Sequence, residues 1–144
     1  MNELEILSIH FVATLLMVGI IWFVQLVHYP LMLYVRTADF RRYSQVNQSR
    51  TAFVVVGLMF VETLPIGWFP NSTAAPAFVG SVLFLVVVWV STAAFQMPLH
   101  RALLGGFEEH LIQRLVRTNW LRTVAWTARS VLVGAVWFSA ISPT

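Results

Sequence analysis

The chain has 144 residues, of which 58% are hydrophobic and only 10% are charged, and its mean hydropathy is +0.76. A soluble domain carries roughly 25% charged residues, and a chain this short has too little interior to bury so much apolar surface. These values exclude a soluble enzyme, a disordered tail and a nucleic-acid-binding module, and they indicate an integral membrane protein. The chain also has no cysteine, which excludes disulfides, iron–sulfur clusters and thiolate metal sites.

Four apolar segments are each long enough to cross a bilayer as a helix, since a hydrocarbon core of about 30 Å needs roughly 20 residues. They span residues 6–29, ending before Pro30, and residues 51–69, 77–97 and 121–141. The ten-residue alternation of membrane β-barrel strands is absent. The first residues are acidic, and no small-residue cleavage site follows the first apolar run, so a removable signal peptide is not expected. We therefore predict one all-α domain over residues 1–144, an integral membrane four-helix bundle.

The arginines predict how this bundle is oriented. All nine basic residues are arginine; seven of them lie between the first and second or the third and fourth apolar segments, and Arg122 lies at the start of the fourth. The opposite side carries Glu3, Glu5 and an uncharged loop at 70–73. By the positive-inside rule, both termini lie outside and the arginine-rich segments are cytoplasmic. The expected location is a bacterial inner (plasma) membrane.

A further helix is predicted on the cytoplasmic side, before the fourth crossing. Apolar residues recur there every four positions between polar ones, at Leu99, Leu103, Phe107, Leu111 and Leu115. This period is typical of an amphipathic helix, interrupted here at Gly105 and Gly106. The helix either lies on the membrane or extends the fourth crossing inward, and membrane lipids are the expected partners.

Polar residues inside the crossings are the candidate functional groups, because ionisable side chains in hydrocarbon are costly. One face of the first crossing holds His10, Thr14, Met17, Ile21, Gln25 and His28. Glu62 lies roughly 16 Å into the second crossing and Arg129 roughly 12 Å into the fourth. These depths predict an ion pair between them, as a structural clasp or as the charge of an active centre.

A second polar group is expected at the cytoplasmic end. Its members are Gln25, His28, Asn47, Arg50, Gln96, His100, Asn119 and Arg122. Hydration of the interface is one explanation, and an anionic or quinone-like headgroup, a haem or a transition metal ion is another. His28 and His100 could ligate a haem or metal between the first and third helices. His10 is a further metal candidate, with Glu62 as the nearby carboxylate.

The aromatic residues are expected mainly at the membrane interfaces. This applies to Trp22, Trp68, Trp120, Trp137 and Tyr29. Trp89 and Trp126 fall deeper, where they would line a ligand pocket or fill the core.

The last third of the chain carries a partial family likeness. The run 97–103 with Pro98 and His100, followed by Asn119, Trp120, Arg122, Trp126 and Arg129, resembles the four-helix membrane family that includes fungal anthrone oxygenases. That family has Asn in a Pro-x-Asn-x-x-Leu element where this chain has His100. The resemblance implies an oxygen- or redox-dependent role on an apolar aromatic or quinone-like substrate, with Pro98, His100, Asn119, Arg122 and Arg129 as matching positions. His10, Trp22 and His28-Tyr29 are similar, more faintly, to haem-binding four-helix protoporphyrinogen oxidases.

These observations favour a small membrane oxidoreductase or oxygenase-like protein acting on a lipophilic or quinone-like substrate. His28 and His100 would be acid–base or ligand groups, and Glu62 and Arg129 would supply buried charge. The expected substrate-binding residues are Gln25, Gln96, Asn119, Arg122 and Trp126. The alternative is a non-enzymatic membrane subunit or assembly factor, whose polar residues serve packing within a homo-oligomer or with a partner subunit. A small transporter or channel is a third reading, although no pair of broken helices is evident.

Overall fold

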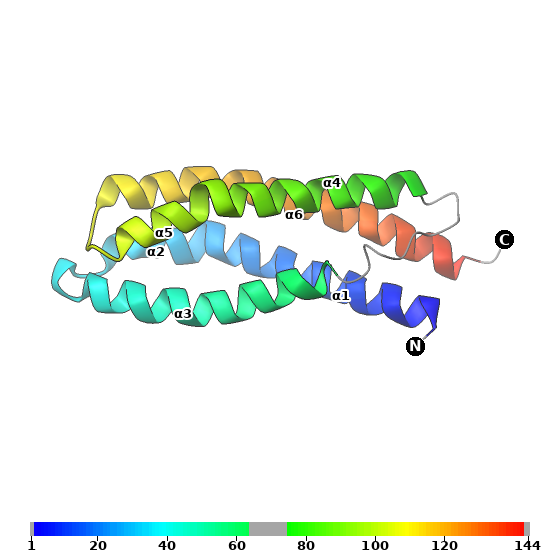
Figure 1. Ribbon diagram of the computed structural model, residues 1–144, viewed down its shortest axis with the longest axis horizontal. Coiled ribbons are helices and arrows are strands. Elements are labelled where there is room, and N and C mark those ends of the chain that lie inside the picture. The colour runs from blue at the N-terminus through cyan, green and yellow to red at the C-terminus, as the bar shows by residue number, and fades with distance from the viewer. Residues whose placement is uncertain (1, 64–74, 143–144) are drawn as a thin grey trace.

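The computed structural model describes residues 2–63 and 75–142, and within these ranges the chain contains helices and no strand (Figure 1). In chain order the elements are α1 Glu3–Phe23, the π-helix η1 Val24–His28, α2 Tyr29–Leu31, the 3-10 helix η2 Met32–Tyr34, α3 Thr37–Val61, α4 Ala75–Ser91, the π-helix η4 Thr92–Gln96, α5 Met97–Leu103 and α6 Glu109–Ile141. They form four long rods, because α1 to η2 are continuous and so are α4 to α5. The predicted all-α four-helix architecture is confirmed.

Three of these rods are long and apolar enough to cross a membrane: Glu3–Tyr34, Ala75–Leu103 and Glu109–Ile141. The second predicted crossing, 51–69, coincides with the apolar half of α3. Its remainder, with Trp68 and the loop at 70–73, falls outside the described residues. Large apolar side chains cover the outer surface of the bundle, such as Phe53 (85% exposed) and Val131 (68% exposed), as expected for helices that face lipid.

Proline does not end the first and third rods, contrary to the prediction. The first helix continues past Pro30 to Tyr34, and the third past Pro98 to Leu103. A π-helix ends two residues before each proline, at His28 and at Gln96. Since proline lacks an N–H and its ring crowds the preceding turn, the wider π turn gives the chain a way to stay helical through it.

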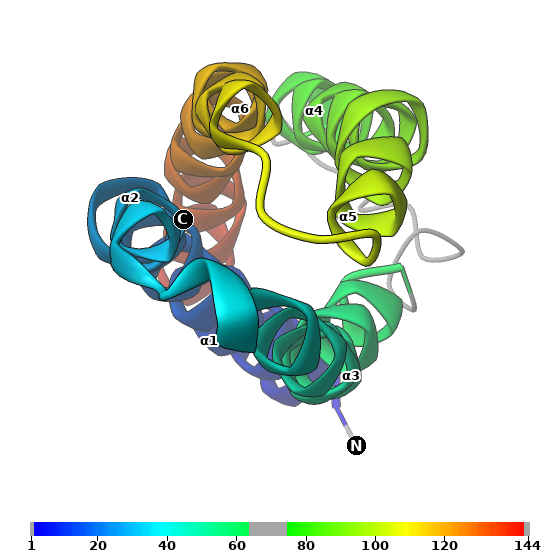
Figure 2. The same cartoon turned by 90° about the vertical axis from the view of Figure 1, so that its left-hand side faces the viewer.

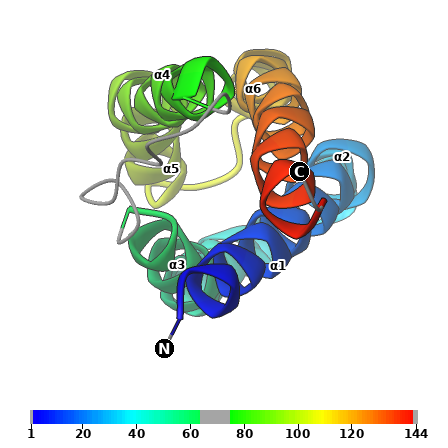
Figure 3. The ribbon, with the colours of Figure 1, turned by 90° about the vertical axis from the view of Figure 1, so that its right-hand side faces the viewer.

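The rods form a ring in which α6 packs between α1 and α4, and α3 packs against α1 and α5 (Figures 2 and 3). Buried apolar residues fill it at three levels. One cluster lies around Phe40, Leu103 and Ile112, a second around Trp126, and a third around Phe78. The predicted inward face of the first crossing is confirmed, because His10, Thr14, Met17, Ile21 and Gln25 are all buried.

The residues of the predicted amphipathic helix are divided between α5 and the start of α6. Leu99 and Leu103 belong to α5, while Leu111 and Leu115 belong to α6, which is continuous with the fourth apolar segment, as in the second of the two predicted arrangements. The break occurs at the predicted glycine pair, where Gly106 has a φ of +148°, a conformation that favours glycine. Phe107 in the connection packs edge-on against Phe40, with ring centroids 5.3 Å apart.

The aromatic residues agree only in part with an interfacial belt. Trp22 and Trp120 are exposed and contact each other edge-on, with centroids 5.7 Å apart. Trp137 is half-buried and donates to Ser8 Oγ at 2.9 Å. Tyr29 is only 4% exposed, so the prediction that it lies in the belt is wrong. Its ring is drawn inward because its hydroxyl has a polar partner inside the bundle.

Candidate functional site

The polar residues of the interior form two separate clusters. The first cluster surrounds Arg129, and the second lies beside a cavity between α1, α3 and α5. Glu62 and Arg129 do not line this cavity, whereas His28, Gln96, His100 and Arg122 do. The proposed catalytic residues are thus divided between two sites.

Arg129 connects all four rods. Its Nη2 donates to Glu62 Oε2 at 2.8 Å, and its Nε lies 3.3 Å from the same oxygen. Its Nη1 donates to the carbonyl of Ser81 in α4 at 2.6 Å, and its Nη2 contacts His10 Nε2 in α1 at 3.1 Å. The predicted ion pair is therefore present, at the level where α3 ends.

The proton positions in this Arg129 cluster follow from the donors. A guanidinium only donates, so His10 Nε2 accepts and the proton of the neutral ring lies on Nδ1. Nδ1 faces Glu62 Oε2 at 3.6 Å, and Thr14 Oγ1 lies 3.0 Å from the same oxygen. One cation, one anion and a neutral imidazole leave no net charge. His10 Nδ1 and Glu62 Oε1 have no hydrogen-bond partner among the described residues. The charge-matched geometry supports a structural clasp, because a buried ion pair that connects the rods holds its helices in fixed order.

The cavity has a volume of about 310 Å³ and is polar at one end only. Its apolar part is lined by Met17, Ile20, Ile21, Val24, Val55 and Val56. Its polar part is lined by His28, Tyr29, Asn47, Gln48, Thr51, Thr92, Gln96, His100, Arg101 and Arg122. Volumes of this order are typical of small-molecule pockets, which combine an apolar wall with a few converging polar groups.

Hydrogen bonds hold both cavity histidines in place. Tyr29 Oη lies 2.9 Å from His100 Nε2, and Asn47 Nδ2 lies 3.1 Å from His28 Nε2. Gln48 Nε2 donates to the His100 carbonyl at 2.7 Å. The amide of Asn47 donates, so His28 Nε2 accepts. His100 Nδ1 is buried and has no hydrogen-bond partner in the described part of the chain.

A buried amide network behind the cavity positions Arg122. Asn119 Nδ2 donates to Gln25 Oε1 at 2.8 Å, and Gln25 Nε2 donates to the Val116 carbonyl at 3.1 Å. Arg122 Nη1 in turn donates to Asn119 Oδ1 at 3.2 Å. Gln25 and Asn119 do not line the cavity, so they orient the guanidinium and do not contact a ligand there.

Two predicted members of the site lie elsewhere. Arg50 is exposed on the outside of α3, so its assignment to the interior cluster is wrong. Its long charged side chain remains in contact with solvent, as expected for an unpaired cation. Trp126 is fully buried in an apolar cluster and does not line the cavity; its ring lies 5.8 Å from the Arg129 guanidinium carbon.

Sequence reasoning missed Tyr29, Gln48 and Thr51 as cavity residues. Tyr29 follows His28 directly, and an interfacial tyrosine is the common reading of such a position. The available signal was spacing: Gln48 and Thr51 stand one and four residues after Asn47, on a segment already marked by that polar side chain.

Metal ligation is not favoured by the geometry. In residues 2–63 and 75–142 no group of three His, Cys, Asp or Glu side chains could hold a metal ion. His28 and His100 each use Nε2 in a hydrogen bond, so a bis-histidine haem would have to displace Asn47 and Tyr29. His10 is held between Arg129 and Glu62. The residues present do not fit the predicted haem.

Comparisons of the chain with family models, with curated proteins and with solved structures find no match. The resemblances to anthrone oxygenases and protoporphyrinogen oxidases remain predictions.

Proposed function

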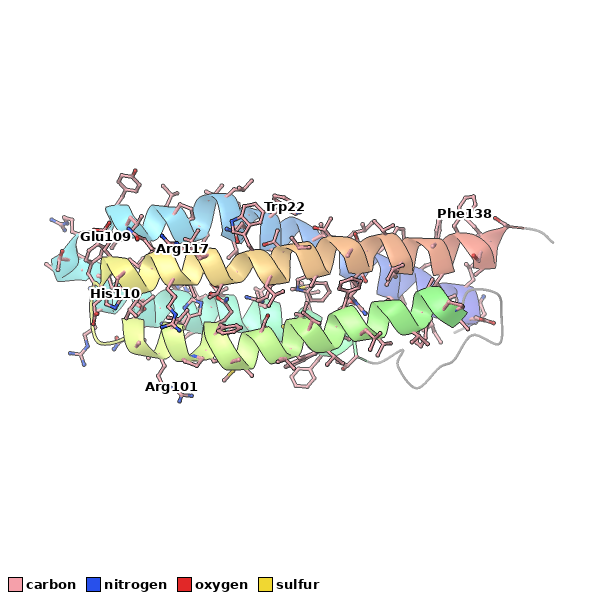
Figure 4. The ribbon with its side chains drawn as sticks, turned by 90° about the horizontal axis from the view of Figure 1, so that it is seen from above. Trp22, Arg101, Glu109, His110, Arg117 and Phe138 are labelled. Atoms are coloured by element: carbon pink, nitrogen blue, oxygen red, sulfur yellow. The ribbon has the colours of Figure 1, made fainter. Side chains whose placement is uncertain are left out.

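We propose that the protein crosses a bacterial inner membrane four times, with the apolar half of α3 in the second crossing. The apolar half of α3 exposes Phe53, Val54, Val56 and Phe60, which lipid would cover. Seven exposed arginines lie toward the end of the bundle that holds α2 and α5, where Figure 4 labels Arg101 and Arg117. The positive-inside rule makes this end cytoplasmic, with both termini outside.

The absence of cysteine gives a clean test of this topology. Single cysteines at Arg42 and at Ser142 would be labelled in intact cells with a membrane-impermeant maleimide. We expect labelling of the Ser142→Cys variant only. Labelling of the Arg42→Cys variant alone would show that the orientation is the opposite of the one proposed.

Within this membrane frame, we propose that the cavity binds a lipophilic, quinone-like molecule on which the protein acts as an oxidoreductase. The observation that carries the proposal is the division of the cavity into an apolar part and a polar end with two histidines and a tyrosine. A lipophilic body fits the apolar part, and oxygen atoms of a ring fit the polar end. The cavity lies between the arginine-rich end of the bundle and the part whose outer surface is apolar. At this level of the membrane an amphiphilic molecule places its polar head.

The polar end has the groups that proton-coupled chemistry needs. Arg122 lies against Tyr29 Oη, so the phenol proton is free to go to His100 Nε2. The proton of the neutral His100 ring then sits on Nδ1, which has no partner among the described residues and is available to an oxygen of the substrate. Reduction of a quinone to its hydroquinone takes up two electrons, which a diffusible two-electron reductant such as a reduced nicotinamide must supply, and two protons, one of which His100 Nδ1 is placed to donate to a quinone oxygen.

The test is binding of a decyl-substituted benzoquinone by the purified protein in nanodiscs, and its turnover with a reduced nicotinamide supplied as the electron donor. Ala52 lies at the cavity and is exposed, so Ala52→Phe would narrow it at little cost in stability. We expect at least a tenfold loss of quinone affinity in this variant and none in Val54→Phe, which lies on the same helix outside the cavity. A His100→Gln variant should bind the quinone and lose turnover. Equal binding by all variants would contradict the proposal.

The exposed arginines favour a second candidate, a membrane subunit that docks a partner or anionic lipid. They are Arg36, Arg41, Arg42, Arg50, Arg101, Arg114 and Arg117, and Arg36 alone pairs with an acid, Asp39, in the described structure. A surface of this kind attracts acidic partners. A partner that co-purifies in fixed ratio and is lost on substituting Arg114 and Arg117 by Gln, with no quinone turnover, would favour this role.

A further inference from the structure

Two buried arginines lie about two turns apart on α6 and differ in their charge balance. Arg129 is 1% exposed and Arg122 is 5% exposed. Arg129 has the carboxylate of Glu62 at 2.8 Å. The chain has six acidic residues, all of them within the described ranges, and none forms an ion pair with Arg122. Arg122 is therefore a buried cation without an anion.

The neighbours of Arg122 are neutral. Its Nη1 donates to Asn119 Oδ1 at 3.2 Å, and the Tyr29 phenol faces it. Its Nε is buried and has no hydrogen-bond partner in the part of the chain that the structure describes. Removing a guanidinium from water without a counter-charge carries a large penalty, which a bound anion would relieve.

The unbalanced charge faces the cavity. Arg122 lines its polar end, together with His100, whose Nδ1 is the other unpartnered donor there. A second guanidinium, Arg101, stands at the cavity among exposed lining residues, which also include Ala52, Val56 and Met97. Since these come from α3 and α5, the cavity opens between these two helices, toward what would be the lipid side and its cytoplasmic edge.

We propose that the molecule bound in this cavity is an amphiphilic anion, whose single negatively charged head contacts Arg122 and His100 and whose apolar body lies along Met17, Ile21 and Val55. This inference rests on the proposed ligand site and narrows its ligands to lipophilic molecules with an ionised acidic head, such as acidic phenols or carboxylic acids. An anionic head offers acceptor oxygens to both unpartnered groups, Arg122 Nε and His100 Nδ1. Its hydrogen bond to the guanidinium is charge-assisted, and such a bond is about twice as strong as a neutral one.

The test compares ligands that share a tail and differ in head charge. Radiolabelled decanoate is bound to the full-length protein in phosphatidylcholine nanodiscs and displaced by unlabelled decanoate, decanol or decyltrimethylammonium. We expect decanoate to compete at least tenfold better than decanol, and the cation not to compete. Equal competition by decanoate and decanol would overturn the proposal without use of any variant.

Variants then locate the charge. Arg122→Gln should lose about 10- to 100-fold in decanoate affinity and leave decanol unaffected, whereas Arg122→Lys, which keeps the charge, should retain most of it. The control Arg117→Gln removes an exposed arginine of the same helix and should bind as the unchanged protein does. Decanoate binding that is the same in Arg122→Gln as in Arg117→Gln would contradict the assignment.

Two further experiments distinguish a lipid anion from a free acid, and the anion site from the proposed quinone function. If the anion is a membrane lipid, phosphatidylglycerol nanodiscs should suppress decanoate binding; if it is a free lipophilic acid, they should not, and in both cases the anion site stands. Decyl-benzoquinone that binds while decanoate fails would reject the anion site and keep the proposed function. Decanoate that binds through Arg122 without quinone binding or turnover would keep the anion site and reject the quinone.

Discussion

The Arg129 and Arg122 clusters place the same side chain of the same helix in two different settings. Around Arg129, the three other rods supply partners, and the charges cancel. Around Arg122, amides and a phenol supply partners, and the positive charge remains. The difference suggests two roles along the bundle. The charge-balanced cluster around Arg129 holds the helices together, and the unbalanced cluster around Arg122 binds a ligand.

The largest expected effect is on stability at the balanced cluster. Arg129→Gln leaves the Glu62 carboxylate, which is 0% exposed, without its counter-charge. Breaking a buried pair by removing one partner costs about 3–5 kcal/mol. The free energy of unfolding in mixed micelles, measured by titration with dodecyl sulfate, should fall by this amount. The control Glu109→Gln, at an exposed position, should change it little.

The double variant Glu62→Gln, Arg129→Gln separates pairing from packing. Because both charges are gone, it should lose less than the sum of the two single variants, with a coupling of about 1–3 kcal/mol. Additive losses would mean that the two side chains stabilise the fold independently and that the clasp is not an energetic unit.

The next effect distinguishes the clusters by ligand. Decanoate at a hundred times its dissociation constant should raise the unfolding free energy of the unchanged protein by about 2.7 kcal/mol, since it binds the folded state only. Arg122→Gln should abolish most of this gain. A gain that persists in Arg122→Gln would place the anion at another arginine and remove the contrast between the two clusters.

The sequence predicted the balanced cluster better than the unbalanced one, for a physical reason. Helical rise alone put Glu62 and Arg129 at similar depth, and opposite charges at equal depth in lipid leave few other arrangements. The face carrying His10, Thr14 and Gln25 was likewise readable from its period. Neither inference needs to know which helices are neighbours.

Predicting the cavity, in contrast, requires knowing which helices are neighbours. Whether Arg50 or Arg122 enters the bundle depends on how α3 and α6 are rotated, and both follow a polar residue at the same spacing, Asn47 and Asn119. Only Arg122 is buried. The continuation of the helices through Pro30 and Pro98 was equally hidden, because a π turn relieves the proline at the level of the backbone without a distinct sequence signal.

A smaller effect is expected from a substitution that makes the Arg122 cluster charge-balanced, like the Arg129 cluster. Asn119→Asp puts a carboxylate where Asn119 Oδ1 now lies, 3.2 Å from Arg122 Nη1, and so gives Arg122 the counter-charge that Arg129 has. Decanoate affinity should fall about tenfold, since the site no longer lacks an anion. Asn119→Ala, which removes the amide and adds no charge, should fall less than threefold. Equal losses in the two variants would show that Asn119 acts by positioning alone.

The smallest expected effect is the stability of the ligand-free protein without Arg122. Although this side chain is 5% exposed, Arg122→Gln should change the free energy of unfolding by less than about 1 kcal/mol, because the lost hydrogen bond to Asn119 is offset by the lost desolvation penalty of an unpaired cation. Detergent-purified protein stripped of bound amphiphile gives the measurement. A loss of several kcal/mol, equal to that of Arg129→Gln, would mean that Arg122 is also a structural charge. The contrast that assigns it to a ligand would then have no energetic basis.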